Sequence, residues 1–145
     1  MTQFSDLDLA RKTLLEEDHA LVIVKDGELL FTSRETSIRP IYRAVKELGE
    51  ALKGASVADK VIGKAAALFC TLAQVKSVYA VLISEIAIET LLAAGIELEY
   101  QKSCPYILNR SRDGMCPVEK LAVDVEDGRI LLEKVGKFLG DIQEG

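Results

Sequence analysis

The sequence predicts an α/β fold in which helices cover both faces of a mixed β-sheet, giving a three-layer α/β/α arrangement. Three features predict it: a hairpin signal around residues 26–27, a strand–helix–strand order over residues 77–100, and helical apolar spacing on either side of both. The chain has 145 residues, 49% of them hydrophobic, and contains no recognisable linker or internal repeat. We therefore expect one domain over residues 1–145.

A helix and a hairpin are predicted first. Ser5 and Asp8 have the spacing of a capping box, so a helix is expected to begin after Ser5, with one apolar face containing Leu7, Leu14 and Leu15. Residues 20–25 and 28–32 are apolar runs separated by Asp26-Gly27, a pair that accommodates the positive φ angles of a two-residue type I′ turn. These two runs predict a β-hairpin.

Two consecutive helices are predicted next. Pro40 suits the first position of a helix, and apolar residues recur at helical spacing up to Gly54, which can end it: Ile41, Val45, Leu48 and Leu52. Residues 63–74 predict another helix, and its first turn carries only small side chains apart from Lys64. That first turn can therefore pack closely against another part of the chain.

A strand, a helix and a second strand follow. Residues 77–83 form a continuous apolar run, which predicts a strand that is covered on both faces and central in the sheet. Ser84 can cap a helix over residues 85–94, which Gly95 can end, and residues 96–100 alternate like a half-exposed strand. Because a single helix joins the two strands, we expect them to be parallel.

The last third of the chain predicts a loop and two helices. Residues 101–115 have no sustained period and contain several turn dipeptides, which predicts a surface loop. Pro117 begins one helix, and a second follows Asp127-Gly128 with an apolar face of Leu131, Val135, Phe138 and Ile142. The alternative at Asp127-Gly128 is a hairpin.

Composition and charge exclude several classes of function. The net charge of -5 argues against a nucleic-acid partner, and the single histidine excludes a metal site built from two or more imidazoles. The most apolar stretch, residues 78–98, is interrupted by Glu85 and Glu89, so no membrane span is predicted. The N-terminus lacks the pattern of a signal peptide, and three cysteines fit reduced thiols. We expect a cytoplasmic protein.

Two segments, residues 59–67 and 116–121, resemble domain-of-unknown-function family 1893, and the resemblance covers nearly the whole chain. The order of the predicted elements is also similar to the cytidine-deaminase-like fold, in which that family is placed. The resemblance implies a cytidine-deaminase-like α/β/α fold. It does not by itself imply an activity.

The resemblance allows a test for deaminase chemistry. A zinc deaminase needs H-x-E or C-x-E at the start of the helix after the hairpin, and P-C-x-x-C at the start of the next helix. We assign those starts to Gly63-Lys64 and Ser84-Glu85, and neither offers a cysteine or histidine ligand. Cys116-Pro117 has one cysteine rather than two and lies too late in the chain. We therefore expect no metal and no other cofactor.

Cys116 and Glu119 are the candidate catalytic residues. Pro117 places Cys116 directly before a helix, where free backbone N–H groups and the helix dipole favour a thiolate, and Glu119 in the first turn could act as an acid or base. The alternative is that Cys116 merely occupies a cap position and Glu119 is a favourable first-turn charge.

A ligand site is expected at the helix start that contains Gly63 and Lys64. A cation in the first turn opposes the helix dipole, so Lys64 needs either a carboxylate such as Asp59 or a bound anion, which the helix N–H groups would also hold. The alternative is an exposed lysine. Ser84, at the next helix start, and Asn109 and Arg110, in the long loop, complete the expected ligand-binding set, although the loop residues could simply form turns.

These observations favour a metal-independent, deaminase-like domain that binds a small ligand, anionic or nucleotide-like, where the carboxyl ends of the strands meet the helix starts. Two alternatives stay open. One is a cysteine-dependent enzyme with Cys116 as the nucleophile, and the other is a non-catalytic regulatory or homo-oligomeric module. Neither the substrate nor the oligomeric state follows from the sequence.

Overall fold

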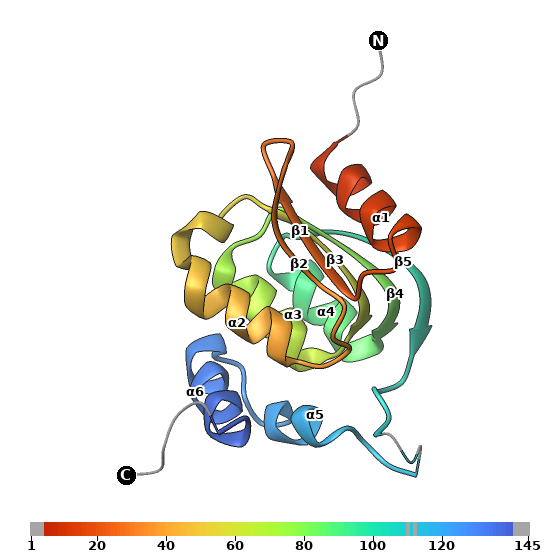
Figure 1. Cartoon of the computed structure of the whole chain (residues 1–145). Helices are drawn as coiled ribbons and strands as arrows, with labels where there is room; N and C mark the ends of the chain where they lie inside the picture. Colours follow the sequence, from red (N-terminus) through yellow and green to blue (C-terminus); the bar gives the residue numbers. More distant parts are fainter. Residues whose placement is uncertain (1–4, 110, 112, 141–145) are drawn as a thin grey trace.

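The computed structural model describes residues 5–109, 111 and 113–140, and Figure 1 shows its arrangement. Its elements follow in chain order: α1 (Asp6–Glu16), β1 (Leu21–Lys25), β2 (Glu28–Ser33), α2 (Arg39–Leu48), the 3₁₀ helix η1 (Gly49–Leu52), β3 (Ser56–Ile62), α3 (Lys64–Ala73), β4 (Ser77–Ser84), α4 (Glu85–Ala93), β5 (Glu97–Cys104), α5 (Pro117–Ala122) and α6 (Gly128–Phe138).

The five strands form one mixed sheet in the order β2-β1-β3-β4-β5. β1 pairs antiparallel with β2 and β3, whereas β4 pairs parallel with β3 and β5. The mixed sheet, the hairpin and the parallel pairing of the strands on either side of α4 are therefore as predicted. Asp26 and Gly27 have φ angles of 52° and 79°, the two positive values that a type I′ turn requires.

The prediction of two consecutive helices after the hairpin is wrong, because β3 lies between α2 and α3. Asp59 and Lys60 interrupt the apolar run of this strand, so neither a continuous nor an alternating pattern is visible in the sequence. The presence of β3 also bears on the prediction that β4 is central in the sheet. β4 pairs on both sides, but β3 holds the middle of the sheet.

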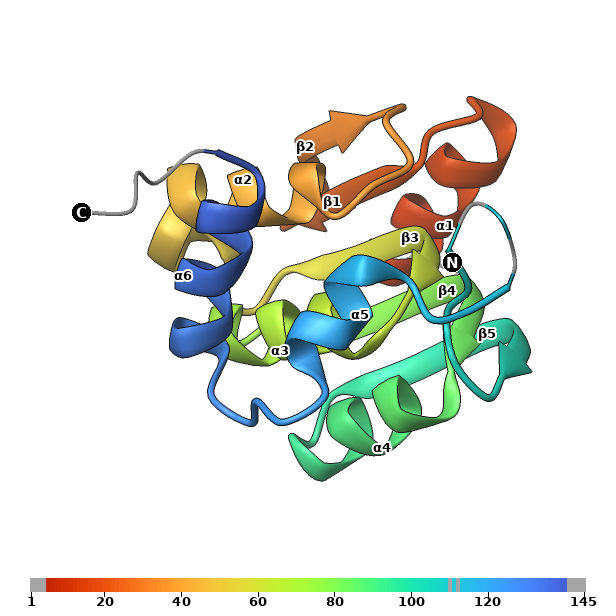
Figure 2. The ribbon, with the colours of Figure 1, turned by 90° about the horizontal axis from the view of Figure 1, so that it is seen from below.

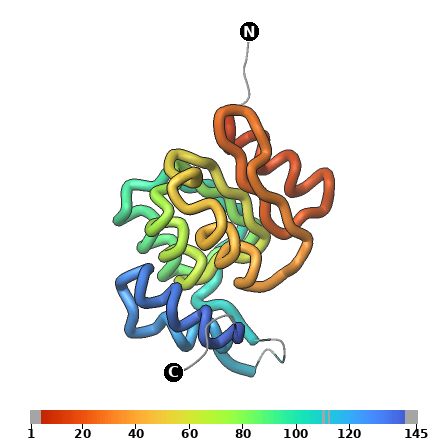
Figure 3. The backbone as a smooth tube through the Cα atoms, turned by 60° about the vertical axis from the view of Figure 1, so that its left-hand side comes forward, coloured from red at the N-terminus to blue at the C-terminus, as the bar shows by residue number. Residues whose placement is uncertain are grey.

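Helices cover both faces of the sheet, which confirms the three-layer α/β/α fold class. α1 packs on one face over β1 and β3, around a small core that contains Leu14, Val22 and Tyr79. α2, α3 and α4 lie on the other face over the larger core (Figure 3). Leu15 of α1 and Phe138 of α6, expected on apolar faces, are half exposed. Ile142 lies outside the described residues.

α5 and α6 pack against α3, which therefore lies between the sheet and these two C-terminal helices (Figure 2). Every residue from Lys64 to Cys70 is buried, as expected of a helix that is covered on all sides. Close packing depends on Gly128 at the start of α6, because a Cβ atom there would lie 2.9 Å from Leu72 Cβ and 3.0 Å from the carbonyl oxygen of Leu68.

Side-chain caps mark the starts of α1, α4 and α6. Ser5 and Asp8 form the predicted capping box, and Ser84 Oγ accepts a hydrogen bond from the N–H of Ala87. Asp127 caps α6, so the chain forms a helix there and not a hairpin. β5 extends to Cys104, four residues beyond the predicted strand, and the loop that follows is correspondingly shorter. In the described part of the chain, no helix has the length and apolarity that crossing a membrane requires.

Candidate functional site

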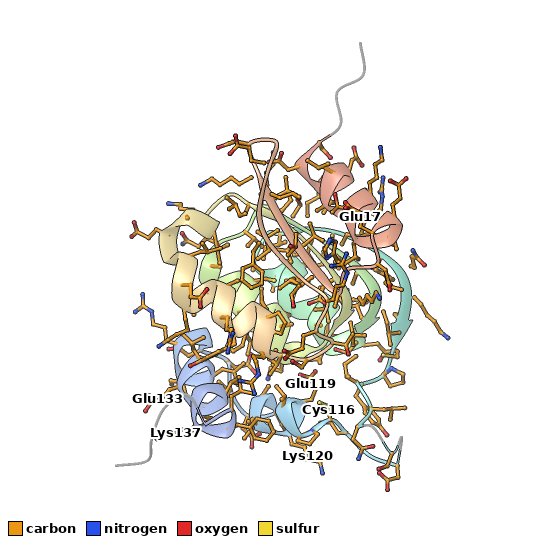
Figure 4. All side chains as sticks on the ribbon, in the orientation of Figure 1. Glu17, Cys116, Glu119, Lys120, Glu133 and Lys137 are labelled. Atoms are coloured by element: carbon orange, nitrogen blue, oxygen red, sulfur yellow. The ribbon has the colours of Figure 1, made fainter. Side chains whose placement is uncertain are left out.

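The carboxylate of Glu119 lies on the N-terminus of α3. The backbone N–H of Lys64 donates to Glu119 Oε1 over 2.6 Å, and the N–H of Ala65 donates to Oε2 over 3.1 Å. Glu119 points from α5 toward the body of the fold, whereas the adjacent Lys120 points away from it (Figure 4). The side chain thus satisfies two of the N–H groups that have no partner within their own helix.

Gly63, the residue before α3, leaves room for this carboxylate. A Cβ atom on Gly63 would lie 1.9 Å from Glu119 Oε1 and 2.3 Å from Cδ, distances that no pair of unbonded atoms tolerates. The backbone of Gly63, with φ -103° and ψ -172°, is open to any residue, so the absence of a side chain is what this position needs. Glycine is required here by close approach.

Lys64 is 5% exposed, and its ammonium group has two acceptors beyond α5. Nζ donates to the carbonyl oxygen of Val123 over 3.0 Å and to Glu126 Oε1 over 2.9 Å. A carboxylate pairs with Lys64 as expected, but it is that of Glu126 and not that of Asp59. The alternative of an exposed lysine is wrong. No local sequence pattern links Lys64 to residues 59 and 62 positions away, which is why this pairing could not be foreseen.

Burial raises the pKa of Glu119 above its ordinary value, and the N–H groups of Ala65 and Lys64 oppose that rise. The loss of water is the larger of the two effects. The ionised carboxylate is therefore held by good hydrogen bonds in a place that would otherwise disfavour its charge.

Asp59 is a half-buried carboxyl group in β3. Its Oδ1 accepts a hydrogen bond from the N–H of Val61 over 3.1 Å. Burial raises the pKa of Asp59 to about 7. Burial also raises the pKa of the Cys70 thiol to about 12, and the charge of Asp59 adds to that rise. Cys70 of α3 is therefore an inert core thiol.

Cys116 is the half-buried N-cap residue of α5, and its backbone N–H donates to the carbonyl oxygen of Ile107 over 2.9 Å. α5, which begins after Cys116, has only six residues. Cys104 lies at the end of β5, with Sγ 3.6 Å from the carbonyl oxygen of Ile83. Burial, followed by the charge of Glu85, raises the pKa of the Cys104 thiol.

The other expected ligand-binding residues have local partners. Ser84 is fully buried, and its hydroxyl caps α4. It follows Ile83, which is paired with Ile62, so Ser84 and Gly63 are neighbours at the carboxyl ends of β4 and β3. The Asn109 side chain exchanges two hydrogen bonds with Asp113. Arg110 lies outside the described residues. The structure thus brings Gly63, Lys64 and Glu119 together, with Ser84 beside them.

The order of elements in the structure corrects which two helix starts would have to carry deaminase ligands. The helix after the hairpin is α2 and the next one is α3, so the two starts are Arg39-Pro40 and Lys64-Ala65, not those of α3 and α4. Neither start carries a cysteine, a histidine or a glutamate. Among the described residues, no three His, Cys, Asp or Glu side chains are grouped in a way that could hold a metal. The residues present do not fit a deaminase zinc site.

Two open hollows lie elsewhere on the molecule. One, of about 480 Å³, is bordered by the C-terminal ends of α2 and α3 and includes Lys25 and Lys53. The other, of about 500 Å³, lies beside the hairpin turn and the start of α1 and includes Asp6 and Ser77. Neither of these two hollows is lined by Glu119, Lys64 or another expected site residue. The N-terminus of α3 is covered by α5.

Comparison with solved structures gives an extensive similarity. A crystal structure of a DUF1893 family protein from Thermotoga maritima superposes with a TM-score of 0.84 at 27% sequence identity, covering 98% of this chain and 93% of that one. Acinetobacter baumannii RibD, form 1, has a TM-score of 0.47 at 24% identity and covers 56% of this chain and 27% of that one. A structure from a study of tRNA:A34 deaminases has a TM-score of 0.43 at 16% identity and covers 66% of this chain and 86% of that one. No curated protein matches the chain.

The sequence itself assigns the chain to a family. The family model for the domain of unknown function DUF1893 matches residues 9–139, which include every element from β1 to α6. The order of elements, a helix and a hairpin followed by alternating helices and strands, is that of the deaminase-like fold implied by the sequence resemblance. The chain belongs to the DUF1893 family.

Proposed function

We propose that this protein binds a small anionic molecule, such as a carboxylate or a nucleotide-like phosphate, at the N-terminus of α3 without a metal ion. The observation that carries the proposal is the pair of N–H groups on Lys64 and Ala65, which already hold an anion, the carboxylate of Glu119. Helix N-termini bind carboxylates and phosphates through this combination of free N–H groups and a favourable dipole. The Glu119 carboxylate therefore occupies the position that a ligand would take at the N–H groups of Lys64 and Ala65, and we call this position the anion seat.

The surroundings of this seat support an exchange of anions. Gly63 and Ala65 present almost no side chain, so an incoming group can approach the backbone as closely as Glu119 does. The ammonium group of Lys64 lies in the same first turn and could change its acceptor from Glu126 to the ligand. Ser84, at the end of the neighbouring strand, is the next polar side chain along this edge of the sheet. The bound molecule would replace acceptors that the chain now supplies itself.

Competition between Glu119 and the ligand supplies the test. Inorganic phosphate and acetate are titrated into the wild-type protein and the Glu119→Ala variant by isothermal calorimetry. Removing the internal competitor should tighten the binding of at least one anion by about tenfold or more, which corresponds to about 1.4 kcal/mol. The control is Glu133→Ala, which removes an exposed carboxylate of α6 that pairs with Lys137 and should leave affinity unchanged.

Two results would contradict the proposal. Equal affinity in the wild type and the Glu119→Ala variant would place any bound anion elsewhere. The absence of binding in both, with the variant shown by circular dichroism to be folded, would mean that Glu119 is only a structural cap. Mass spectrometry of the purified wild-type protein under native conditions adds an independent readout, because a co-purified anionic molecule would appear as a defined mass increment.

A further inference from the structure

Residues 117–126, which comprise α5 and the turn after it, hold the first turn of α3 through three acceptors. We call this segment the strap. Glu119 accepts from two backbone N–H groups, and the carbonyl oxygen of Val123 and the carboxylate of Glu126 accept from Lys64 Nζ. We propose that the strap is an autoinhibitory cover, released from α3 when an anion takes the place of Glu119. This inference rests on the proposed function.

The polar contacts of the strap form one unit because Lys64 makes three of the four hydrogen bonds and the adjacent Ala65 makes the fourth. Lys64 supplies both a backbone N–H and the ammonium group, so it meets the strap at its beginning and at its end. An anion that bound the N–H groups of Lys64 and Ala65 would displace Glu119 and attract the Lys64 ammonium group away from Glu126. The loss of one contact therefore weakens the others.

The apolar contacts of the strap are few and small. Its buried apolar side chains are Val118, Ala122 and Val125. α5 has six residues and packs mainly on α3 and α6. β3 and β4, by contrast, are paired on both sides within the sheet. Such a short helix with little buried area is the kind of element that opens locally while the rest of a domain stays folded.

The electrostatics of the two glutamates also favour release. Burial raises the pKa of Glu119, so its ionised form gains from transfer back to water. The Glu126 side chain is 82% exposed, and its pairing with Lys64 is accordingly worth little once a competing anion is present. The strap is held by interactions that an external anion can replace.

Hydrogen exchange measured by mass spectrometry on the full chain tests this inference. Peptides covering residues 117–126 are followed in the wild type alone, in the wild type with saturating inorganic phosphate, and in the Glu119→Gln variant alone. We expect exchange in the strap to accelerate by about tenfold in the last two samples, with no change in β1 or β4 of the phosphate-bound wild type. Gly63→Ala keeps Glu119 in the sequence but prevents its carboxylate from reaching the N–H groups of Lys64 and Ala65, so this variant should behave like Glu119→Gln.

The outcomes separate the two proposals. If calorimetry shows that phosphate binds the α3 site while exchange in the strap is unchanged, the strap is not a cover, and the proposed function stands. If neither phosphate nor acetate binds, the proposed function fails, and anion-triggered opening fails with it. Faster exchange throughout the phosphate-bound wild type would show global destabilisation and would also overturn a local release.

Discussion

Substituting alanine for Gly63 removes one specific interaction without altering the backbone. The new Cβ atom would lie 1.9 Å from Glu119 Oε1 and 2.7 Å from Oε2, so the carboxylate must leave its position. Two hydrogen bonds to a charged acceptor would be lost, each worth about 1.5–3 kcal/mol. Part of this loss is recovered because the carboxylate returns to water. We expect unfolding to become easier by about 2–4 kcal/mol.

The assay is urea unfolding followed by circular dichroism, since the chain has no tryptophan. Gly63→Ala should be harmful only while Glu119 is present. In a Glu119→Ala background, Gly63→Ala should therefore be neutral or stabilising by up to about 1 kcal/mol, because alanine lowers the entropy of the unfolded chain. The matched control is Gly114→Ala, whose Cβ would be 3.7 Å from its nearest neighbour, Asn109 Nδ2. An equal cost of Gly63→Ala in both backgrounds would refute the role of Glu119.

Three further predictions concern other parts of the structure. The pKa of Asp59 is raised from 3.8 to about 7, so its contribution to stability is present below pH 3.8 and is lost as pH rises through about 7. The wild type should therefore lose roughly 1–3 kcal/mol of unfolding free energy between pH 5 and 8, after allowance for solvent screening. Asp59→Asn should remove that loss, which urea unfolding at each pH measures. Gly128→Ala should lower stability by about 1–3 kcal/mol through its clash with Leu72 and should lower the thermal midpoint, and an unchanged midpoint would contradict the close packing of α3 and α6. Glu126→Gln should cost less than about 1 kcal/mol, because its partner contact is exposed on the Glu126 side, and a cost above about 2 kcal/mol would show that this pair is stronger than we infer.

Local signals in the sequence are sufficient to predict most of the helices and strands. The capping box at Ser5, the Asp26-Gly27 turn and the Ser84 cap each act within a few residues, and each forms in the structure. β3 could not be foreseen in the same way. It is stabilised by pairing with β1 and β4, which are distant in sequence, while Asp59 and Lys60 hide its pattern.

The candidate site was only partly predictable for a related reason. Small residues after Gly63 indicate that something approaches the start of α3, and Glu119 is recognisable as a first-turn carboxylate. The contact between Glu119 and the start of α3 depends on how α5 folds back over α3, because 55 positions of sequence separate Lys64 from Glu119. Sequence patterns place Glu119 on its own helix, whereas its hydrogen bonds are made to another one.

The central claim is that the ionised side chain of Glu119 occupies the anion seat at the N-terminus of α3. The most direct measurement is an NMR pH titration that follows the Glu119 carboxyl carbon together with the amide N–H groups of Lys64 and Ala65. The account predicts that all three signals titrate together, with a pKa above the ordinary glutamate value of 4.5, and that both amide transitions vanish in Glu119→Gln. Amide signals of Lys64 and Ala65 that do not respond to the titration of Glu119 would contradict this claim.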